Sequence, residues 1–341
     1  MPLKGVKIEL TAMNQKYKIL RSDDEAAVVC DFASDVDIGL SAGQKSISSK
    51  YLYDAEGDRL FQRIMDLPEY YLTRCEYEIL LKNRDRILQA IGSGPINLVE
   101  LGAGDGKKTF LLLEYLIAEG LKFKYVPIDI SQSAICGLTQ SCCDFDSSMA
   151  IEGLVADYFD GLKWLSRQNR LRNFVLFLGS NIGNFTQAEM ELFLSGLWDA
   201  LNGGDLVLIG FDLKKDINRI KQAYDDSLGV TARFNLNLLV RINRELGGNF
   251  DTDQFRHHCT YNEQLDAVES YLISKGDQEV TIKSLGKTYT FKENEPVHIE
   301  YSHKFSKNDI ALLAHKAGFE IVDHFYDERH LFVDSLWRAI K

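Results

Sequence analysis

Glu100-Leu-Gly102-Ala-Gly104-Asp-Gly106-Lys-Lys108 joins a segment with the pattern of a buried strand, 97–102, to one with the pattern of a helix, 108–118. Glycines at such a junction let the backbone approach a ligand closely, because they carry no side chain and accept positive φ angles. The helix that follows directs its free amides at the same place. The stretch therefore predicts a nucleotide-binding loop at the carboxyl end of a strand.

Strand-like and helix-like segments alternate on the C-terminal side of this loop. Short apolar runs predict the strands, and amphipathic segments with capping residues predict the helices between them. Including the strand before the loop, the predicted strands of this part are 97–102, 124–130, 152–157, 173–179 and 205–212. Such alternation is typical of a parallel sheet with helices on both faces.

The end of the chain predicts a different strand pairing. Segments 320–326 and 330–337 both have strand character, and only residues 327–329 separate them. So short a link requires an antiparallel pair, because a parallel pair needs a long crossover. Five parallel strands finished by an antiparallel hairpin are typical of the Rossmann-like sheet of methyltransferases.

Residues 214–299 interrupt the alternation. They predict two helices, 216–224 and 231–245, and a β-rich piece at 279–291. The expected fold class is therefore α/β, a Rossmann-like methyltransferase sheet with an inserted α+β substrate domain, which the N-terminal segment joins.

The glycine spacing separates three kinds of nucleotide loop. A dinucleotide loop has the form G-x-G-x-x-G, but Lys107 occupies the third glycine position. A P-loop has the form G-x-x-x-x-G-K-[ST], which Gly106-Lys107-Lys108 fails in both spacing and hydroxyl. The form E-x-G-x-G-x-G is the usual S-adenosylmethionine loop.

Acidic residues end the next two predicted strands. Asp129 ends the second strand, where its carboxylate can accept hydrogen bonds from both ribose hydroxyls of a nucleotide, of NAD as well as of S-adenosylmethionine. Asp157 ends the third strand, where methyltransferases usually contact the adenine amine. Together with the glycine spacing, the two residues favour S-adenosylmethionine as the cofactor.

Several longer strings carry a resemblance to a known family. They are 51–57 (YLYDAEG), 67–74 (LPEYYLTR), 99–104 (VELGAG), 125–129 (YVPID), 177–185 (FLGSNIGNF), 223–230 (AYDDSLGV), 234–244 (FNLNLLVRINR) and 299–305 (IEYSHKF). From about residue 48 to the C-terminus the chain resembles the histidine Nα-methyltransferases of ergothioneine biosynthesis.

The resemblance implies a core, 79–212 and 300–341, that binds S-adenosylmethionine, and a substrate-binding domain, 1–78 and 213–299. It implies three successive methyl transfers to the α-amine of a free amino acid, giving hercynine from histidine and S-adenosylhomocysteine from the cofactor. The matching positions imply cofactor contacts from Gly102, Gly104, Lys108, Asp129, Asp157 and the backbone at Tyr158.

The resemblance also implies the acceptor site. The α-amine and carboxylate are expected to contact Tyr53, Tyr70, Asn184 and Tyr224, and the imidazole Glu300 and Ser302. Of these, Tyr53 is expected to relay the amine proton and Asn184 to orient the amine. Without the resemblance, core aromatics and a solvated strand face would be the favoured explanations of Tyr70, Tyr224, Glu300 and Ser302.

One stretch departs from the family. Residues 251–271 align loosely, and Ser270 stands where family members often carry an apolar residue such as Met. This leaves open another aromatic amino acid or a tryptophan-derived amine as the acceptor. His257 and His258, in the same stretch, are interpreted as ordinary polar loop or helix positions.

Two further alternatives differ in class. A nicotinamide-dependent oxidoreductase is disfavoured by the missing third glycine and by the terminal hairpin. A non-catalytic module that binds S-adenosylmethionine is disfavoured by the many polar matches around the acceptor site.

Composition limits the partners. The net charge of −11 over 341 residues argues against nucleic acid as the main partner, since phosphate binding needs clustered Lys and Arg. The six cysteines form no CxxC pair, which indicates reduced thiols and no metal site. No signal peptide or membrane span is apparent, so we expect a cytoplasmic monomer that acts on a small molecule.

Overall fold

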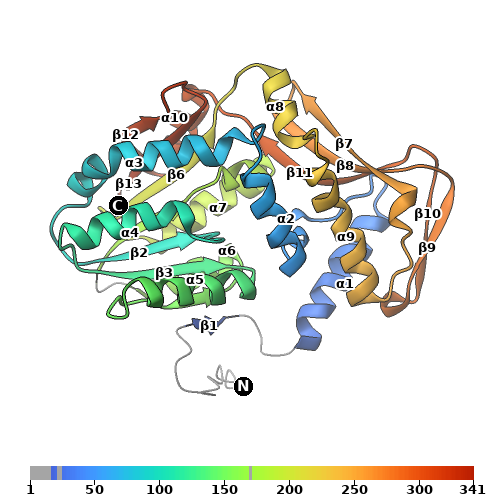
Figure 1. Cartoon of the computed structure of the whole chain (residues 1–341), viewed down its shortest axis with the longest axis horizontal. Coiled ribbons are helices and arrows are strands. Elements are labelled where there is room, and N and C mark those ends of the chain that lie inside the picture. The colour runs from blue at the N-terminus through green and yellow to red at the C-terminus, as the bar shows by residue number, and fades with distance from the viewer. Residues whose placement is uncertain (1–16, 21–24, 169–170) are drawn as a thin grey trace.

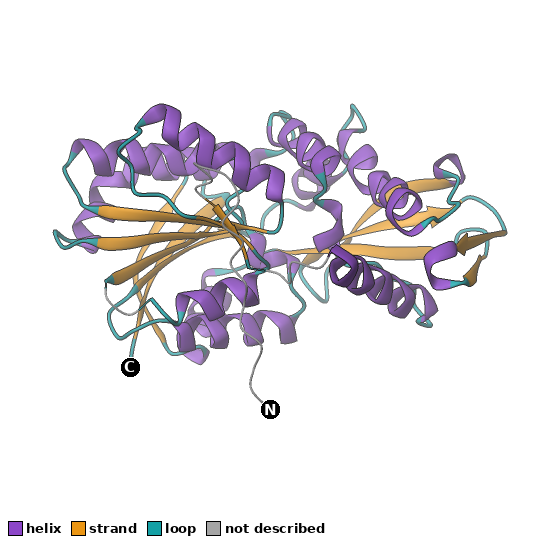
Figure 2. Ribbon diagram, turned by 90° about the horizontal axis from the view of Figure 1, so that it is seen from below, coloured by secondary structure: helices purple, strands orange, loops and turns teal. Residues whose placement is uncertain are grey.

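The computed structural model describes residues 17–20, 25–168 and 171–341. These residues form two lobes, one built on a large sheet and the other on small sheets (Figure 1). Seen from below, the large sheet has helices on both sides (Figure 2).

The large sheet has eight strands over the described residues. Their order is β1 (Tyr17–Ile19), β4 (Gly153–Val155), β3 (Phe123–Asp129), β2 (Ile96–Leu101), β5 (Arg172–Phe177), β6 (Leu206–Asp212), β13 (Phe332–Ala339) and β12 (Phe319–Tyr326). The strands from β1 to β6 pair in parallel, and β13 pairs antiparallel with both β6 and β12. The predicted parallel strands and terminal hairpin are confirmed.

The number of parallel strands needs correction from five to six. Strand β1, from the N-terminal segment, pairs with β4 at the sheet edge. Its three residues are half-buried or exposed, so they show none of the apolar pattern by which the buried strands are recognised.

Two hydrophobic cores cover the two faces of the sheet. Helices α3 (Tyr71–Ile91), α4 (Lys107–Ala118) and α5 (Gln132–Phe145) pack on one face, and α6 (Tyr158–Leu165), α7 (Gln187–Ala200) and α10 (Lys307–Lys316) on the other. Along β6, Leu208 faces the first core and Ile209 the second. Burial on both faces explains why these strands read as unbroken apolar runs.

Capping boxes begin two of the helices that cover the sheet. Thr186 and Glu189 form a capping box at α7, and Ser306 and Asp309 form one at α10. Each box pairs two backbone amides that have no partner within the helix. Helix α6, in contrast, was not predicted, and Gly161, a poor helix former, lies in the middle of its eight residues.

The smaller lobe combines two small sheets with four helices in the described residues. One sheet is β11 (Pro296–His303), β8 (Ala267–Ser274) and β7 (Phe255–Asn262), and the other is β9 (Gln278–Ile282) with β10 (Lys287–Phe291). The helices are α1 (Glu25–Ser41), α2 (Ala55–Met65), α8 (Ile217–Tyr224) and α9 (Val230–Leu246). Short 3-10 turns are η1 (Ser49–Leu52), η2 (Asn181–Asn184), η3 (Thr252–Gln254) and η4 (Lys283–Leu285).

The loosely aligned stretch is a pair of strands. His257 and His258 lie on β7, so their placement in a loop or helix was wrong. Residues 255–262 mix exposed, half-buried and buried side chains, and this irregular pattern hid the strand. The β-rich piece at 279–291 is confirmed as the β9–β10 hairpin.

Two of the three expected domain boundaries fall inside elements, and the third, at 212/213, coincides with the end of β6. The boundary at 78/79 lies within α3 and the one at 299/300 within β11. Moreover, the core that covers α3 and α4 continues into α9 and β8, so the two lobes share buried residues. No helix of the described residues is long and apolar enough to cross a membrane.

Candidate active site

A pocket opens between the two lobes, beside the carboxyl ends of β5 and β6. All six residues expected at the acceptor site line it: Tyr53, Tyr70, Asn184, Tyr224, Glu300 and Ser302. They come from five separate segments, namely the η1–α2 junction, the start of α3, η2, α8 and β11. Such a position matches the carboxyl-edge location at which open α/β sheets bind ligands.

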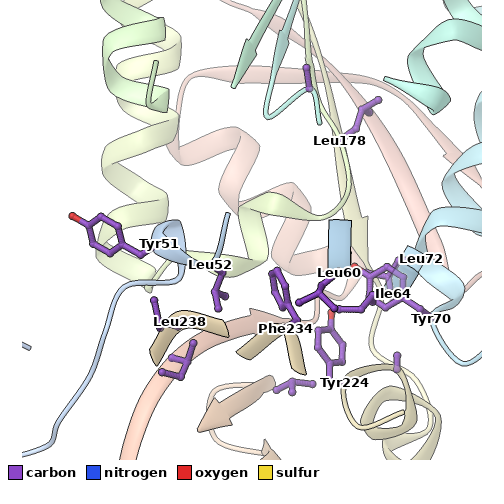
Figure 3. Packing of buried hydrophobic residues seen from close by; sticks show 14 of the residues in the cluster. Tyr51, Leu52, Leu60, Ile64, Tyr70, Leu72, Leu178, Tyr224, Phe234 and Leu238 are labelled. Atoms are coloured by element: carbon purple, nitrogen blue, oxygen red, sulfur yellow. The ribbon is translucent and has the colours of Figure 1, made fainter. Parts of the chain in front are cut away.

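Aromatic rings form a continuous chain along the pocket. Tyr53 and Phe234 are 5.6 Å apart between ring centroids, Tyr53 and Phe61 are also 5.6 Å apart, and Phe61 lies 6.2 Å from Tyr70. Tyr70 in turn lies 6.2 Å from Tyr224. Figure 3 shows Tyr70, Tyr224 and Phe234 gathered with Ile64. These edge-to-face contacts fix the rings relative to one another.

Glu300 supplies a buried acid in this pocket. Burial raises its pKa to about 7, although the positive charge of Lys304 opposes the shift. A carboxyl group with such a pKa changes its charge in the physiological range, which is common at functional sites. Ser270, which departs from the family pattern, is buried across from Glu300 in β8 and is not among the residues that line the pocket.

Two hydroxyl groups meet beside Glu300. Tyr224 Oη and Ser302 Oγ are 2.7 Å apart, and both are contacted by the ammonium of Lys304, at 3.0 Å and 2.7 Å. Burial raises the pKa of Tyr224 well above its usual value, so its phenol keeps its proton. Lys304 was not predicted as a site residue.

Asn184 is placed by the turn that follows β5. Ser180 adopts a left-handed conformation with φ 58° and begins η2, whose last residue is Asn184. Gly183 lies against the backbone of β11, where a Cβ would come within 3.0 Å of the His303 oxygen. This close approach holds the turn, and Asn184 with it, against the strand that carries Glu300 and Ser302.

His257 determines the orientation of a further pocket residue, Asn235. The Tyr224 carbonyl can only accept, so His257 Nε2 donates to it at 2.9 Å. Nδ1 of the neutral ring therefore accepts from Asn235 Nδ2 at 2.9 Å. Asn235 Oδ1 is buried without a hydrogen-bond partner, and Asn235 lines the pocket. The amide therefore offers an acceptor to a ligand.

The glycine loop lies next to this pocket. Gly102, Gly104 and Gly106 all have positive φ angles. At Gly102, a Cβ would lie 2.8 Å from Asn181 Nδ2 and 2.9 Å from Tyr158 Oη. Asn181 also lines the pocket, so the loop is in contact with a wall of the acceptor site.

Asp129 stands at the carboxyl end of β3 facing the loop. Its carboxylate accepts from the amides of Gly104 and Ser131, each at 2.9 Å. Burial raises the pKa of Asp129, and the two amide hydrogen bonds work against that shift. Asp129 thus ties the glycine loop to the turn after β3.

The other expected cofactor residues have structural partners as well. Asp157 caps α6 by accepting from the Asp160 amide at 2.8 Å, and Tyr158 begins that helix, where amides lack a partner within the helix. Lys108 is paired with the buried carboxylate of Glu76 on α3. Burial disfavours the ammonium, but Glu76 outweighs it and raises the pKa of Lys108.

Comparison with known proteins identifies the family. The family model described as "Histidine-specific methyltransferase, SAM-dependent" matches residues 32–339. The chain belongs to this family.

Curated relatives agree with the match. The histidine N-alpha-methyltransferase of Mycolicibacterium smegmatis is 37% identical over 83% of this chain and 87% of its own length. That of Mycobacterium tuberculosis is 37% identical over 89% of this chain and 93% of its own length. Ergothioneine biosynthesis protein 1 of Neurospora crassa is 32% identical over 83% of this chain, a match that covers 32% of the fungal protein.

Membership in this family decides whether the chain is a methyltransferase or a protein of another functional class. The chain is an S-adenosylmethionine-dependent N-methyltransferase, so a nicotinamide-dependent oxidoreductase and a non-catalytic binding module are both excluded.

The residues of the loop fit this cofactor. Gly102 has a positive φ angle and no room for a Cβ, so the backbone of the loop stays bare, and Asp129 places a buried carboxylate beside the loop. The carboxylate can accept from ribose hydroxyls, and the free amides at the start of α6 can donate to the adenine ring.

Several pocket residues were missed from the sequence. Phe61, Asn181, Phe234 and Asn235 line the pocket. Asn181, Phe234 and Asn235 lie inside the strings 177–185 and 234–244 that carry the resemblance, so a signal for them existed. Phe61 lies outside those strings, on the apolar face of α2, where its helical spacing indicates core packing equally well.

Proposed function

We propose that this methyltransferase converts histidine to hercynine by three successive methyl transfers to the α-amine. The observation that carries the proposal is the convergence of Tyr53, Tyr70, Asn184, Tyr224, Glu300 and Ser302 on one pocket beside the glycine loop. An acid and a hydroxyl pair stand together on the β11 side of this pocket, which suits a ring with two nitrogen atoms.

The binding roles follow from the chemistry of the side chains. The Glu300 carboxylate accepts from one imidazole nitrogen, and the Ser302–Tyr224 hydroxyl pair contacts the other. The Tyr70 hydroxyl donates to the substrate carboxylate. The Asn184 side-chain oxygen accepts a hydrogen bond from the α-amine. This orients the lone pair of the amine nitrogen toward the cofactor side of the pocket.

The reaction needs alignment more than acid–base chemistry. S-Adenosylmethionine supplies a methyl group that its sulfonium already activates. The protein then has to hold a neutral amine in line at near-attack distance. Burial raises the pKa of Tyr53 well above its usual value, so the phenol relays the amine proton to water as a neutral hydroxyl and not as a phenolate.

The chain of aromatic rings suits the product. Each transfer removes a hydrogen-bond donor from the amine, and the final trimethylammonium has none. A cation of this kind is stabilised by the faces of Tyr and Phe rings. Tyr53, Phe61, Phe234 and Tyr70 offer such faces as a fixed set.

We further propose how the chain is organised. The cofactor-binding core comprises β1 and the segments from α3 to β6 and from α10 to β13, and the substrate lobe comprises the segments from α1 to α2 and from α8 to β11. This assignment moves the expected boundaries to the nearest element ends. We also propose that the enzyme acts as a cytoplasmic monomer.

Product analysis tests the proposed function. Protein incubated with S-adenosylmethionine and a panel of free amino acids, histidine and tryptophan among them, is expected to add three methyl groups to histidine, as measured by mass spectrometry. Methylation of tryptophan or another amine, with histidine unchanged, would contradict the proposed acceptor.

Histidine binding is expected to weaken as the pH falls below about 7. The pKa of Glu300 is raised to about 7, so below that pH the carboxyl group is protonated and loses its charge-assisted hydrogen bond to the ring. Calorimetric titration of the S-adenosylhomocysteine complex with histidine measures this. In Glu300→Gln the slope of log affinity against pH should fall by about one, because one titrating group is gone. An unchanged slope would show that Glu300 does not titrate on binding.

A further inference from the structure

Lys304 is a buried cation directly behind the pocket. Its side chain is fully buried, and it lies on β11's C-terminal side, two residues after Ser302. It forms a buried ion pair with Asp212 at the end of β6, with Nζ 3.1 Å from Oδ2. Asp212 also accepts from Tyr71 at 2.9 Å and pairs with Lys215.

The hydrogen bonds of Lys304 can be counted. An ammonium group has three N–H donors and no acceptor. Its three neighbours are Asp212 Oδ2, Tyr224 Oη and Ser302 Oγ, at 3.1, 3.0 and 2.7 Å. All three donors are therefore used, and both hydroxyl oxygens must accept from Lys304.

The same count fixes the hydroxyl protons. Tyr224 and Ser302 together carry two, and one of them lies in the 2.7 Å hydrogen bond between the two oxygens. The other proton has no place within the triad and points outward. Since Tyr224 and Ser302 both line the pocket, the pair presents a donor to the ligand whichever hydroxyl carries the free proton.

A ligand ring must then bring one acceptor and one donor. The acceptor meets the hydroxyl pair and the donor meets Glu300. A neutral imidazole has one of each, whereas an imidazolium has two donors and no acceptor. An imidazolium would leave its second N–H facing the hydroxyl donor, which is a buried mismatch.

We propose that Lys304 is a positioning residue that forces the Tyr224–Ser302 pair to donate, so that the pocket selects a neutral imidazole over an imidazolium. The inference rests on the proposed function, since it takes the ring of histidine as the ligand at this wall. It assigns to Lys304 a specificity role exerted through Tyr224 and Ser302, without contact with the substrate.

The charged groups around the pocket would have opposite effects on the protonation of the bound ring. Besides the hydroxyl pair, the titratable groups around Lys304 are Asp212, Lys215, Tyr71, Cys259, Tyr261, Glu300 and His303. Glu300, which also lines the pocket, would by itself favour a charged ring and raise the pKa of a bound imidazole. The charge of Lys304, and the outward hydroxyl proton of the Tyr224–Ser302 pair, lower the pKa of the bound imidazole.

The test observes the ring directly. Histidine labelled with ¹⁵N in the imidazole is bound to the complex of the wild-type enzyme with S-adenosylhomocysteine, and its nitrogen shifts are followed by NMR as the pH is lowered. The bound ring should stay neutral, with one N–H, to at least about one pH unit below the usual imidazole pKa of about 6.5. A bound ring that is doubly protonated at about pH 6.5 would overturn the inference.

Variants test whether Lys304 is the cause. In Lys304→Met the hydroxyl pair becomes free to accept, so the titration midpoint of the bound ring should rise by at least about one pH unit. Lys307→Met, which removes an exposed cation from α10, should leave the midpoint in place. Ser302→Ala should also keep the ring neutral, because Tyr224 alone still accepts from Lys304 and donates to the ring.

The outcomes separate the inference from the proposed function. An unchanged midpoint in a folded Lys304→Met would refute the role of Lys304 while histidine binding stands. If the wild-type complex binds no histidine at all, the proposed function falls and the inference with it. If Lys304→Met does not fold, the wild-type titration still tests the inference, because a doubly protonated bound ring at about pH 6.5 would overturn it.

Discussion

Replacing Gly102 with alanine is expected to abolish most of the cofactor affinity. The residue has φ 72°, and an added Cβ would lie 2.8 Å from Asn181 Nδ2 and 2.9 Å from Tyr158 Oη. A non-glycine residue in this conformation costs about 1–2 kcal/mol, and both neighbouring side chains must also move. We expect the Kd for S-adenosylhomocysteine to rise by at least about 100-fold, which corresponds to about 2.7 kcal/mol.

Gly120→Ala is the matched control for this variant. Gly120 has nearly the same φ angle, 73°, at the end of α4, but no atom lies within 4 Å of the position of its Cβ. Gly120→Ala therefore introduces the same backbone strain as Gly102→Ala but no steric clash. Calorimetric titration of both variants, with thermal unfolding alongside, separates lost binding from lost stability. Wild-type cofactor affinity in Gly102→Ala would show that the loop does not hold the cofactor.

Glu300→Ala is expected to remove most of the activity on histidine. The substitution leaves an imidazole N–H without a partner in a buried pocket, and hydrogen bonds to charged groups contribute about 1.5–3 kcal/mol. We expect kcat/KM for histidine to fall by about 10- to 150-fold, with cofactor affinity unchanged because Glu300 is not among the residues expected to contact the cofactor.

An exposed glutamate provides the comparison. Glu279, on β9, is solvent-exposed and does not line the pocket, so Glu279→Ala should leave kcat/KM as it is. Steady-state kinetics with histidine and with tryptophan should show a loss in Glu300→Ala that is specific to histidine. Equal losses on both amino acids would indicate a general structural effect, and no loss would remove Glu300 from the site.

Local pattern accounts for most of what could be predicted of the fold. The apolar runs of β2, β3, β5 and β6 and the capping boxes of α7 and α10 lie within a few residues of the features they predict. The glycine loop is equally local. Strand β7 and helix α6 were missed, because irregular burial in the first and a central glycine, Gly161, in the second weaken the local signal.

The acceptor site was predicted by resemblance and not by pattern. Tyr70 and Tyr224 have helical or core spacing, which is compatible with ordinary packing. Phe61 has the same spacing and lies outside the resembling strings, so it was missed. His257, interpreted as a polar loop or helix position, is a half-buried ring that holds Asn235, because α9 covers β7 in the tertiary structure.

By itself, the sequence determined the alternation of strands and helices along the parallel sheet and the nucleotide loop, because short-range periodicity, capping chemistry and residue spacing are properties of neighbouring residues. The family followed from the resemblance of longer strings. Only the tertiary structure decided that Lys304 is buried between Asp212 and the Tyr224–Ser302 pair. These residues are up to 92 positions apart, from Asp212 to Lys304. The direction of their protons follows from which groups the fold encloses together, since a buried donor must be satisfied by whatever acceptors distant elements bring to it.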